Sequence, residues 1–535
     1  MPRAAELDGH DIRHPIVVVG AGPVGLCCAL ALAHHGMRVV VVDGKTSVSD
    51  GSRAICIARH SLEIFQQLGV ADRFLGKALP WTHGTSFYRE EPVFRLEMPH
   101  DADERFFPMY NLQQQYIELF LAEAAAAEPL IELRWGHRLL GLTASDDGVR
   151  LAIDCAHGDY MLAADWLVAA DGARSQVRQA LDLPLRGEAY EGRYVIVDVH
   201  LPSDYPTERR AFFDPPANPG ATVLVHKQPD DIWRIDYQLG PDDDESAALA
   251  EPAIRARVAA IVAMLGERAP WSLVWWSLYK AYTLCLDDYR HGRVLFAGDA
   301  AHLVPIFGVR GLNSGLADVA NLAWKLAYVG QGRAPHQLLD SYTPERRGAT
   351  LDIFERAGKS TRFMTPPSRG QRLVRDAALE LARHHDCVRR LLDPRQSVPY
   401  SYITSPLTST DPVGGEAAGP CPGSALPNVR LGADDFLLDR LGPGFNLITI
   451  GAAGKAGAIA ALGRHAARRG IPFNHVALKA SAAAGCAAEC GTRYAAPAGS
   501  AWLARPDRHV CARWTVFDSA AACRALDRAA GWRES

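Results

Sequence analysis

The chain has 535 residues, of which 48% are hydrophobic and 22% are charged, and its formal net charge is -4. A chain of this length is too long for one compact core, so we expect about two to four domains. The composition is that of a globular protein rather than a disordered one. Because no excess of basic residues is present to neutralise phosphates, we expect a small-molecule ligand and no nucleic-acid partner.

The first motif follows a short β-branched run at residues 16–19, which is typical of a strand buried on both faces of a parallel sheet. GAGPVG at residues 20–25 comes next, then an apolar helix that ends at Gly36, and then a second strand, MRVVVVD. Glycines and a proline interrupt the apolar stretch at residues 16–33. We therefore interpret it as strand, turn and helix, and expect no membrane partner.

The three glycines of GAGPVG have separate tasks in a dinucleotide site. Gly20 allows a tight turn, Gly22 allows close approach of a pyrophosphate, and Gly25 allows the helix to pack closely on the strand. The N-terminus of the helix presents unpaired N–H groups and partial positive charge to the phosphates. Asp43 ends the second strand, where its carboxylate can bind ribose hydroxyls. An acid at this position favours FAD or NAD over NADP.

Two later segments repeat the pattern of a buried strand that ends in polar residues. Residues 166–181, WLVAADGARSQVRQAL, predict strand, turn and helix with Asp171 at the end of the strand. Residues 293–302, RVLFAGDAAH, predict a buried strand that runs into Gly298 and Asp299. Ligands of open α/β sheets collect at the carboxyl ends of the strands, so we expect these residues to lie near the glycine turn.

Together, the GAGPVG turn, the Asp171 segment and the Gly298-Asp299 segment, in this order and at this separation, resemble the flavoprotein aromatic hydroxylases of the para-hydroxybenzoate hydroxylase type. The resemblance covers residues 15–360. PIFGVRGLNSG, residues 305–315, is closest to the 3-(3-hydroxyphenyl)propionate hydroxylase branch. The resemblance implies an α/β fold with a Rossmann-like FAD-binding domain, an inserted β-rich substrate domain and a C-terminal thioredoxin-like domain.

The resemblance also implies roles for single residues. Asp299 would hold a ribityl hydroxyl, and Pro305 would lie beside the isoalloxazine ring. The pyrimidine edge would be hydrogen-bonded by the backbone of Gly311, Leu312 and Asn313. N–H groups at the start of a helix from Asn313 can stabilise negative charge on a reduced flavin, which agrees with this assignment.

Two further positions match the family pattern. Arg53 corresponds to an arginine that reaches the cofactor, and Gln114 to a flavin-contacting glutamine at the head of a long helix. From the residues alone, the ordinary interpretation of each is a polar surface residue. Many relatives have a second proline and a Gly-Gln pair where this chain has Ile306 and Val309-Arg310, which leaves the choice of substrate open.

Residues 186–286 contain several β-strand patterns joined by Pro, Asp and Gly turns. A sheet here would cover the flavin and form a mostly apolar substrate pocket with a few polar groups. Arg234 matches a family arginine near flavin and substrate, and with Pro305 it is a candidate for the catalytic site. The alternative for Arg234 is an ordinary surface pair with Asp236.

Two histidines have competing interpretations. His226 could face the substrate, but a structural histidine with satisfied hydrogen bonds is the expected interpretation. His302 follows Asp299 closely enough to suggest an acid/base pair. Because the flavin itself would do the chemistry, we expect a structural or capping role for His302.

The tail changes character twice. Residues 331–395 have a helical pattern, and residues 396–425 are rich in Pro, Gly and Ser and predict an ordered crossing or linker. Strands with helices between them follow, without a CxxC pair, so packing or subunit contact is expected there rather than thiol redox chemistry. Cys486 and Cys490 leave a metal or redox pair as the weaker alternative, and no metal is expected.

These observations give an expected division of the chain. It comprises a discontinuous FAD-binding domain (residues 1–80, 101–185 and 287–360), a substrate-binding sheet domain (81–100 and 186–286), a helical connection (361–400), a linker (401–425) and a thioredoxin-like domain lacking CxxC (426–535).

The activity implied by the resemblance is that of an FAD-dependent monooxygenase that hydroxylates a phenolic substrate. NADPH or NADH would reduce the flavin, and O2 would form a flavin C4a-hydroperoxide that an apolar sheet protects from water. One oxygen atom would then pass to a ring carbon. We expect a monomer or homodimer in the cytoplasm, since eleven cysteines without a CxxC pair suit a reducing compartment.

Two rival functions stay open. A flavin-dependent epoxidase or oxygenase of a polyketide-like ring would use the same cofactor chemistry. A non-catalytic carrier that keeps the flavoprotein fold would bind no flavin, or a flavin that no substrate makes reducible.

Overall fold

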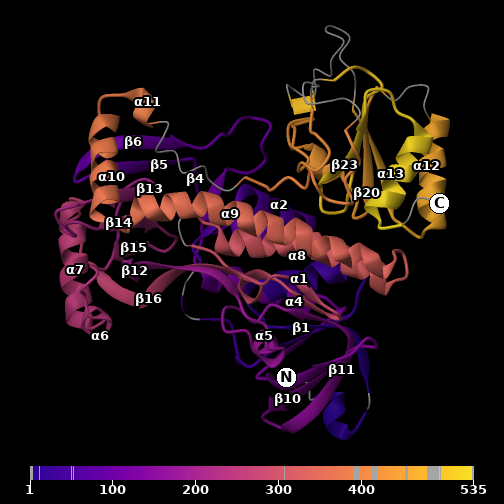
Figure 1. Ribbon diagram of the computed structural model, residues 1–535, viewed down its shortest axis with the longest axis horizontal. Helices are drawn as coiled ribbons and strands as arrows, with labels where there is room; N and C mark the ends of the chain where they lie inside the picture. The colour runs from indigo at the N-terminus through magenta and orange to yellow at the C-terminus, as the bar shows by residue number, and fades with distance from the viewer. Residues whose placement is uncertain are drawn as a thin grey trace.

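The computed structural model describes residues 4–10, 12–49, 51, 54–305, 308–389, 398–411, 419–451, 456–478, 493–494 and 496–532. Arg53, Cys486 and Cys490 therefore lie outside the described residues. The described chain is a mixed α/β structure with two eight-stranded sheets, a four-stranded sheet and a three-stranded sheet. Figure 1 shows the first large sheet at the bottom, the second at the left and the four-stranded sheet at the upper right.

The first sheet contains the glycine turn. Its strands are β1 (Arg13–Val19), β2 (Val39–Asp43), β8 (Ile131–Trp135), β9 (Arg138–Ala144), β10 (Val149–Cys155), β11 (Gly158–Ala169), β17 (Arg290–His291) and β18 (Val294–Phe296). The order is β17-β18-β11-β1-β2-β8, with β10 and β9 attached through β11. Strands β18, β11, β1, β2 and β8 are mutually parallel. The β-branched runs of β1 and β2 are almost wholly buried, as their continuous apolar sequence predicts.

Helices cover the first sheet. Helix α1 (Pro23–His34) follows β1 and packs against α8 (Gly311–Gly330) and α4 (Gln114–Ala127). The shorter helices of this region are α2 (Arg59–Gln67), α3 (Ala71–Leu75) and α5 (Gln176–Ala180). None of the helices in the described ranges is long and apolar enough to span a membrane.

The second sheet is antiparallel over most of its width. Its order is β19-β16-β12-β15-β14-β13-β5-β6, with the bounds β19 (His302–Leu303), β16 (Ser272–Cys285), β12 (Arg186–His200), β15 (Ile232–Gln238), β14 (Thr222–Lys227), β13 (Arg209–Phe213), β5 (His83–Tyr88) and β6 (Glu91–Glu97). Alternate residues of β12, β14 and β15 pack in an apolar core with α7 (Glu251–Met264), which α6 (Glu245–Ala248) precedes. The opposite face carries the polar residues, as the two-residue period of a strand requires.

The three-stranded sheet lies between these parts and consists of β3 (Cys56–Ala58), β7 (Met109–Asn111) and β4 (Leu79–Trp81). The helical pattern predicted after α8 is confirmed in α9 (Tyr342–Met364), α10 (Arg369–Ala382) and α11 (Asp386–Arg389). Helices α8 and α9 run side by side across the middle of the molecule (Figure 1).

The last sheet has the order β21-β20-β22-β23, with β20 (Phe445–Ile450), β21 (Phe473–Leu478), β22 (Ala501–Ala504) and β23 (Val510–Trp514). Strands β20 and β21 are parallel and are connected through α12 (Ala456–Arg468), whereas β22 and β23 are antiparallel to their neighbours. Helix α13 (Ser519–Ala529) packs against α12.

A buried ionic cluster joins this last sheet to α8 and α9. Arg505 is 1% exposed and donates to both oxygens of Glu345 in α9 and to Asp507. Lys325 of α8 is fully buried and lies 2.6 Å from Glu345. Burial alone raises the pKa of Glu345, but Arg505 and Lys325 outweigh it and hold the pKa far below its ordinary value. The polar side of α8 is therefore buried as well as its apolar side.

Removing Arg505 would leave Glu345 and Asp507 buried without their shared guanidinium. We expect Arg505→Met to lower the free energy of unfolding by about 3 to 5 kcal/mol, measured by urea denaturation with tryptophan fluorescence. The control is Arg255→Met, since Arg255 pairs with Glu251 on a half-exposed helix surface where ion pairs contribute about 0 to 1 kcal/mol. Equal losses in the two variants would contradict the prediction.

Candidate functional site

Three strand ends meet at one edge of the first sheet. Val19 of β1 pairs with Ala169 of β11, and Ala169 pairs with Phe296 of β18, all in parallel register. The next polar or glycine positions, Gly20, Asp171 and Gly298, therefore lie beside one another at the carboxyl edge. This is where open α/β sheets bind their ligands.

The three glycines of the first turn have different surroundings in the structure. Gly20 has φ +106°, and a Cβ there would lie 2.4 Å from the carbonyl oxygen of Ala170. A Cβ on Gly25 would lie 1.8 Å from the carbonyl oxygen of Gly20. Gly22 precedes α1, and no protein atom lies within 4 Å of the Cβ it lacks. Two glycines thus permit the packing, while Gly22 leaves open space at the helix N-terminus, where an anion is stabilised.

Asp43 holds the glycine turn in place. One carboxylate oxygen accepts from the backbone N–H of Ala21 at 2.7 Å, and the other accepts from the backbone N–H of Lys45 at 2.8 Å. A carboxylate oxygen can accept more than one hydrogen bond, so these contacts leave capacity for ribose hydroxyls. The ribose contact of Asp43 stays a prediction.

Asp171 and Gln114 also have protein partners. Asp171 accepts from the backbone N–H of Val177 at the start of α5, and burial raises the pKa of its carboxyl. Gln114 begins α4, accepts from the N–H of Ala54 and donates to Glu118. Neither is an ordinary polar surface residue, because each fixes a loop next to the strand ends.

The end of β18 is anchored by a fully buried carboxylate in α8. Asp318 accepts from the backbone N–H of Gly298 at 3.0 Å and from Arg346 at 2.7 Å, and it lies 2.7 Å from Nε2 of His302. Burial alone raises the pKa of Asp318, but His302 and Arg346 outweigh it and hold the pKa below its ordinary value. The partner of His302 is therefore Asp318 rather than Asp299, and its role is structural. Asp299 itself is exposed beside Gly298.

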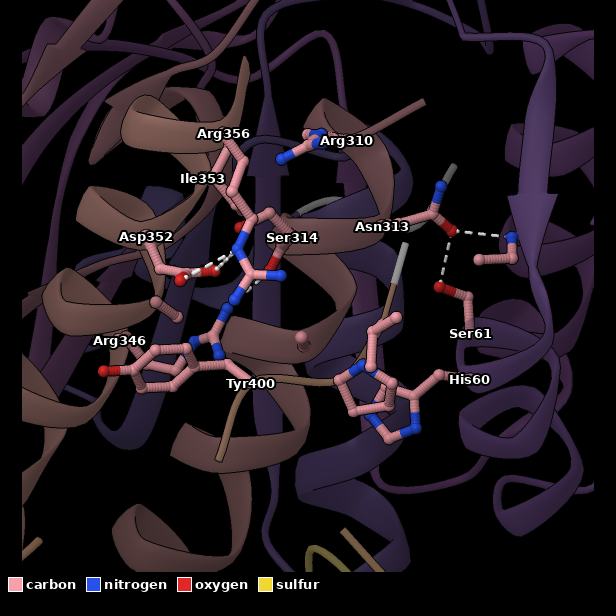
Figure 2. Close-up of a pocket in the computed structure, with 15 residues that line it drawn as sticks. His60, Ser61, Arg310, Asn313, Ser314, Arg346, Asp352, Ile353, Arg356 and Tyr400 are labelled. Atoms are coloured by element: carbon pink, nitrogen blue, oxygen red, sulfur yellow. Dashed lines mark hydrogen bonds and ion pairs between the residues drawn. The ribbon is translucent and has the colours of Figure 1, made fainter. Parts of the chain in front are cut away.

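The N-terminal turn of α8 begins at Gly311. By helix geometry the N–H groups of Gly311, Leu312 and Asn313 have no acceptor within the helix, so they are available to a ligand. The side-chain oxygen of Asn313 accepts from the N–H of Ala58 and the hydroxyl of Ser61, as Figure 2 shows. These bonds fix the helix start against β3 and α2.

The loop before α8 carries backbone strain. Pro305 is buried, Gly308 has φ +93° and Val309 has φ +59°. A β-branched residue at positive φ is a genuine outlier that costs about 1 to 3 kcal/mol. Val309 is one of the positions at which this chain departs from the pattern of many relatives, and here it adopts a backbone conformation that suits glycine.

A row of ionisable side chains crosses the polar face of the second sheet. The strand register places Arg209 opposite His226, His226 opposite Arg234, and Arg234 opposite Asp198. Arg234 is 1% exposed and donates to both oxygens of Asp198. The expected alternative for Arg234, a surface pair with Asp236, is wrong because the pairing strand β12 supplies a different carboxylate.

Several atoms on this polar face have no partner among the described residues. They are Nδ1 of His226, both amide atoms of Gln228 and Oδ1 of Asp236, all in side chains at least nine-tenths buried. The guanidinium of Arg209 makes no hydrogen bond or ion pair with another described residue. The hydrogen bond expected for a satisfied structural histidine is therefore not found at Nδ1 of His226 among the described residues. Burial, assisted by Arg209 and Arg234, lowers the pKa of His226 well below its ordinary value.

This polar face and the start of α8 meet at β3. Cys56 of β3 is buried near Arg209, Arg234 and Asp236, and burial raises the pKa of its thiol to about 12. Its carbonyl oxygen accepts from Asn313 of α8. Sequence reasoning missed Arg209, Gln228 and Asp236. The only signal in the sequence was the two-residue alternation along this part of the chain, which places these side chains on the polar face. The register between strands is a tertiary property, so the sequence did not show that the three residues lie together.

No group of three or more His, Cys, Asp or Glu side chains suited to a metal ion occurs in the part of the chain that the structure describes. The residues present instead fit a dinucleotide. Open space at Gly22, a helix start beside it and a second helix start at Gly311 are the features that such a ligand needs.

Comparison with known proteins agrees with this site. Residues 13–357 match the family described as FAD binding domain. The chain is 33% identical over 373 residues to 3-(3-hydroxy-phenyl)propionate/3-hydroxycinnamic acid hydroxylase 2 of Burkholderia vietnamiensis (strain G4 / LMG 22486), covering 69% of this chain and 67% of that protein. It is 31% identical over 378 residues to the corresponding hydroxylase of Mycobacterium sp. (strain JLS), covering 70% of this chain and 64% of that protein.

Among solved structures, the flavin-dependent monooxygenase PieE in complex with FAD and substrate is similar over 97% of this chain and 99% of that chain, with a TM-score of 0.80 and 25% identity. The chain therefore belongs to the FAD-binding domain family, and its fold is that of FAD-dependent monooxygenases. The match to the Mycobacterium hydroxylase spans just under two thirds of that relative's length.

Two glycine substitutions should differ strongly in their effect on stability. We expect Gly25→Ala to lower the free energy of unfolding by about 3 kcal/mol or more, because its Cβ would collide with backbone rather than with a flexible side chain. Gly22→Ala should change it by less than about 0.5 kcal/mol, since the position is open and its backbone is extended. Urea denaturation of the flavin-free proteins measures both values. Similar losses would show that Gly22 is also a packing position.

Proposed function

We propose that the protein is an FAD-dependent monooxygenase that hydroxylates a phenolic aromatic substrate with NADPH or NADH and O2. The observation that carries this proposal is the meeting of three strand ends, at Gly20, Asp171 and Gly298, within the segment that matches the FAD-binding family. The names of the hydroxylases to which the chain is similar support the reaction class.

The proposed cofactor site uses the residues of that edge. Gly22 and the start of α1 would bind the pyrophosphate, Asp43 the ribose, and Asp299 a ribityl hydroxyl. Further contacts are assigned to Gly20, Gly25, Arg53, Gln114, Asp171, Gly298 and Pro305. Bound FAD would supply hydride acceptance and oxygen activation. The N–H groups of Gly311, Leu312 and Asn313 would stabilise negative charge on its pyrimidine edge.

We also propose the domain division expected from the sequence. The first sheet with α1, α4, α8 and α9 forms the FAD-binding domain, and the second sheet with α7 forms the substrate domain. The last sheet, with a parallel β20-α12-β21 unit and two antiparallel strands, forms a thioredoxin-like domain. Its burial of Arg505 against α9 supports a packing role.

The substrate would lie between the polar face of the second sheet and the start of α8. Arg209 is a partly buried cation that forms no ion pair with a carboxylate among the described residues, so it is suited to an anionic group of the substrate. Gln228 and His226 offer unused hydrogen-bonding atoms beside it. The Arg234–Asp198 pair would hold this face rigid. The relatives are named for aromatic carboxylic acids, which supports a phenol that carries a carboxylate.

The first experiment uses the purified protein with FAD and a panel of three phenols. The panel contains 3-(3-hydroxyphenyl)propionate, a phenol without a carboxylate and a polycyclic phenol. We expect the first to accelerate NADPH or NADH oxidation most and to yield a product heavier by one oxygen atom in mass spectra. A preference for the polycyclic compound would favour oxygenation of a polyketide-like ring. A protein that takes up no FAD would overturn the proposal, and Gly22→Ala should bind FAD at least about tenfold more weakly.

The second experiment tests Arg209 as the substrate-binding cation. We expect Arg209→Gln to raise KM for an anionic phenol about tenfold or more with a smaller effect on kcat, because a charge-assisted hydrogen bond is lost. The variant should be about as stable as the parent, since the side chain that it shortens is only partly buried and forms no ion pair with a described residue. Arg150→Gln, on an exposed position of β10, is the control. An unchanged KM in Arg209→Gln would contradict the assignment of Arg209 as the substrate-binding cation.

The same site predicts a pH dependence. Burial raises the pKa of Asp236 to about 7, although Arg234 and Arg209 act against this. As pH rises through 7 the carboxyl becomes charged and competes with the substrate for Arg209. KM for an anionic phenol should therefore rise above pH 7, and Asp236→Asn should remove that rise.

A further inference from the structure

A cavity lies on the side of α8 that faces α9. It has a volume of about 80 Å³ and is bounded by α2, α8, α9 and residues 398–400. On α8, Gly315 packs toward Gly298 and Val24, whereas Ser314 faces the cavity. Figure 2 shows the side chains of Arg310, Arg346 and Arg356 around the same space. Nothing in the proposed flavin chemistry uses this cavity.

One hydroxyl group in the cavity wall forms no hydrogen bond within the part of the chain that the structure describes. Ser314 is 5% exposed, and its Oγ has no hydrogen-bond partner among the residues that the structure describes. The neighbouring Asn313 differs, because its side chain is bonded to Ala58, Ser61 and Val309. A buried hydroxyl that is left unpaired reduces stability, so a ligand atom in the cavity that accepted its hydrogen bond would recover that loss.

The charges around the cavity are predominantly positive. Arg310 is 6% exposed, and burial together with the nearby Arg356 lowers its pKa. Arg356 is 44% exposed and pairs with Asp352 one turn earlier in α9. Arg346 already donates to Asp318, to Tyr402 and to the carbonyl oxygen of Ser314. Asp352 is the one carboxylate among the described residues of the cavity wall. It lies near the guanidinium groups of Arg310 and Arg356, which repel each other.

We propose that this cavity binds a small oxyanion of phosphate size, held by Arg310, Arg356 and the hydroxyl of Ser314. The negative charge of the anion would offset the repulsion between the two guanidinium groups. One of its oxygen atoms would accept a hydrogen bond from the hydroxyl of Ser314. Its size fits, because about 10 to 15 Å³ of such cavity volume is enough for one water molecule, so a cavity of about 80 Å³ has room for an oxyanion of phosphate size. Guanidinium groups are suited to oxyanions, whose oxygens accept two parallel N–H bonds.

The test is calorimetric titration of the full-length protein, as purified, with inorganic phosphate at constant ionic strength. We expect saturable binding, and Arg356→Gln and Ser314→Ala should each weaken it, the former about tenfold or more. Asp352→Asn should tighten binding, because it removes the carboxylate that competes for Arg356. This reversal of sign separates a defined site from general surface charge.

Arg255→Gln is the matched control, since Arg255 and Glu251 form the same type of helix-surface pair on α7. Its phosphate affinity should equal that of the parent. Absence of saturable binding would overturn the proposal. Equal affinity in the parent and in both Arg356→Gln and Ser314→Ala would do so as well, because the phosphate would then bind elsewhere.

The oxyanion could be free or could be the phosphate of a nucleotide. Titration with NADP+ in the presence of saturating phosphate distinguishes the two sources. Competition that Arg356→Gln abolishes would assign a nucleotide phosphate to the cavity. Phosphate binding that NADP+ leaves unchanged would assign a free anion. Both results support the site, whereas NADP+ competition that survives Arg356→Gln would place the phosphate elsewhere and contradict it.

Discussion

The buried carboxylate of Asp318 is the constraint on which the site depends. It binds the backbone N–H of Gly298 at the end of β18, the imidazole of His302 and the guanidinium of Arg346 in α9. A buried carboxylate that lost these partners would cost several kcal/mol. The strand end and the two helices therefore have one favourable arrangement, in which Arg346 also donates to the carbonyl oxygen of Ser314 in the first turn of α8.

The same requirement extends into the last sheet. Arg346 follows Glu345 in α9, and these neighbours point to different partners: Arg346 to Asp318, and Glu345 to Lys325 and Arg505. Each charge is neutralised by a residue from another element. Buried ion pairs consequently join α8, α9 and the last sheet, and the hydrogen bond from Gly298 to Asp318 links the end of the first sheet to them. Docking of the last sheet is thus coupled to the helix start that faces the proposed flavin.

Local patterns predicted one part of the site, while tertiary pairing decided the rest. The glycine turn and the strand ends at Asp171 and Gly298 were predictable, because a buried strand followed by glycine or aspartate is a pattern of consecutive residues. The partner of Arg234 was not predictable. Asp236 is its neighbour in sequence, but the antiparallel register with β12 brings Asp198 to its guanidinium. The burial of Lys325 was equally hidden, since its partner Glu345 lies in another helix.

The two buried polar regions differ in a way that separates architecture from binding. Around Glu345, each carboxylate oxygen has a cationic partner, so the cluster is complete without a ligand. On the second sheet, the amide of Gln228 and the imidazole of His226 keep atoms without partners in the described structure, and Arg209 keeps its charge. Such groups reduce stability when left alone. A polar ligand that supplied the missing partners would recover this loss, which supports the proposal that the substrate binds on this sheet rather than at the ionic cluster.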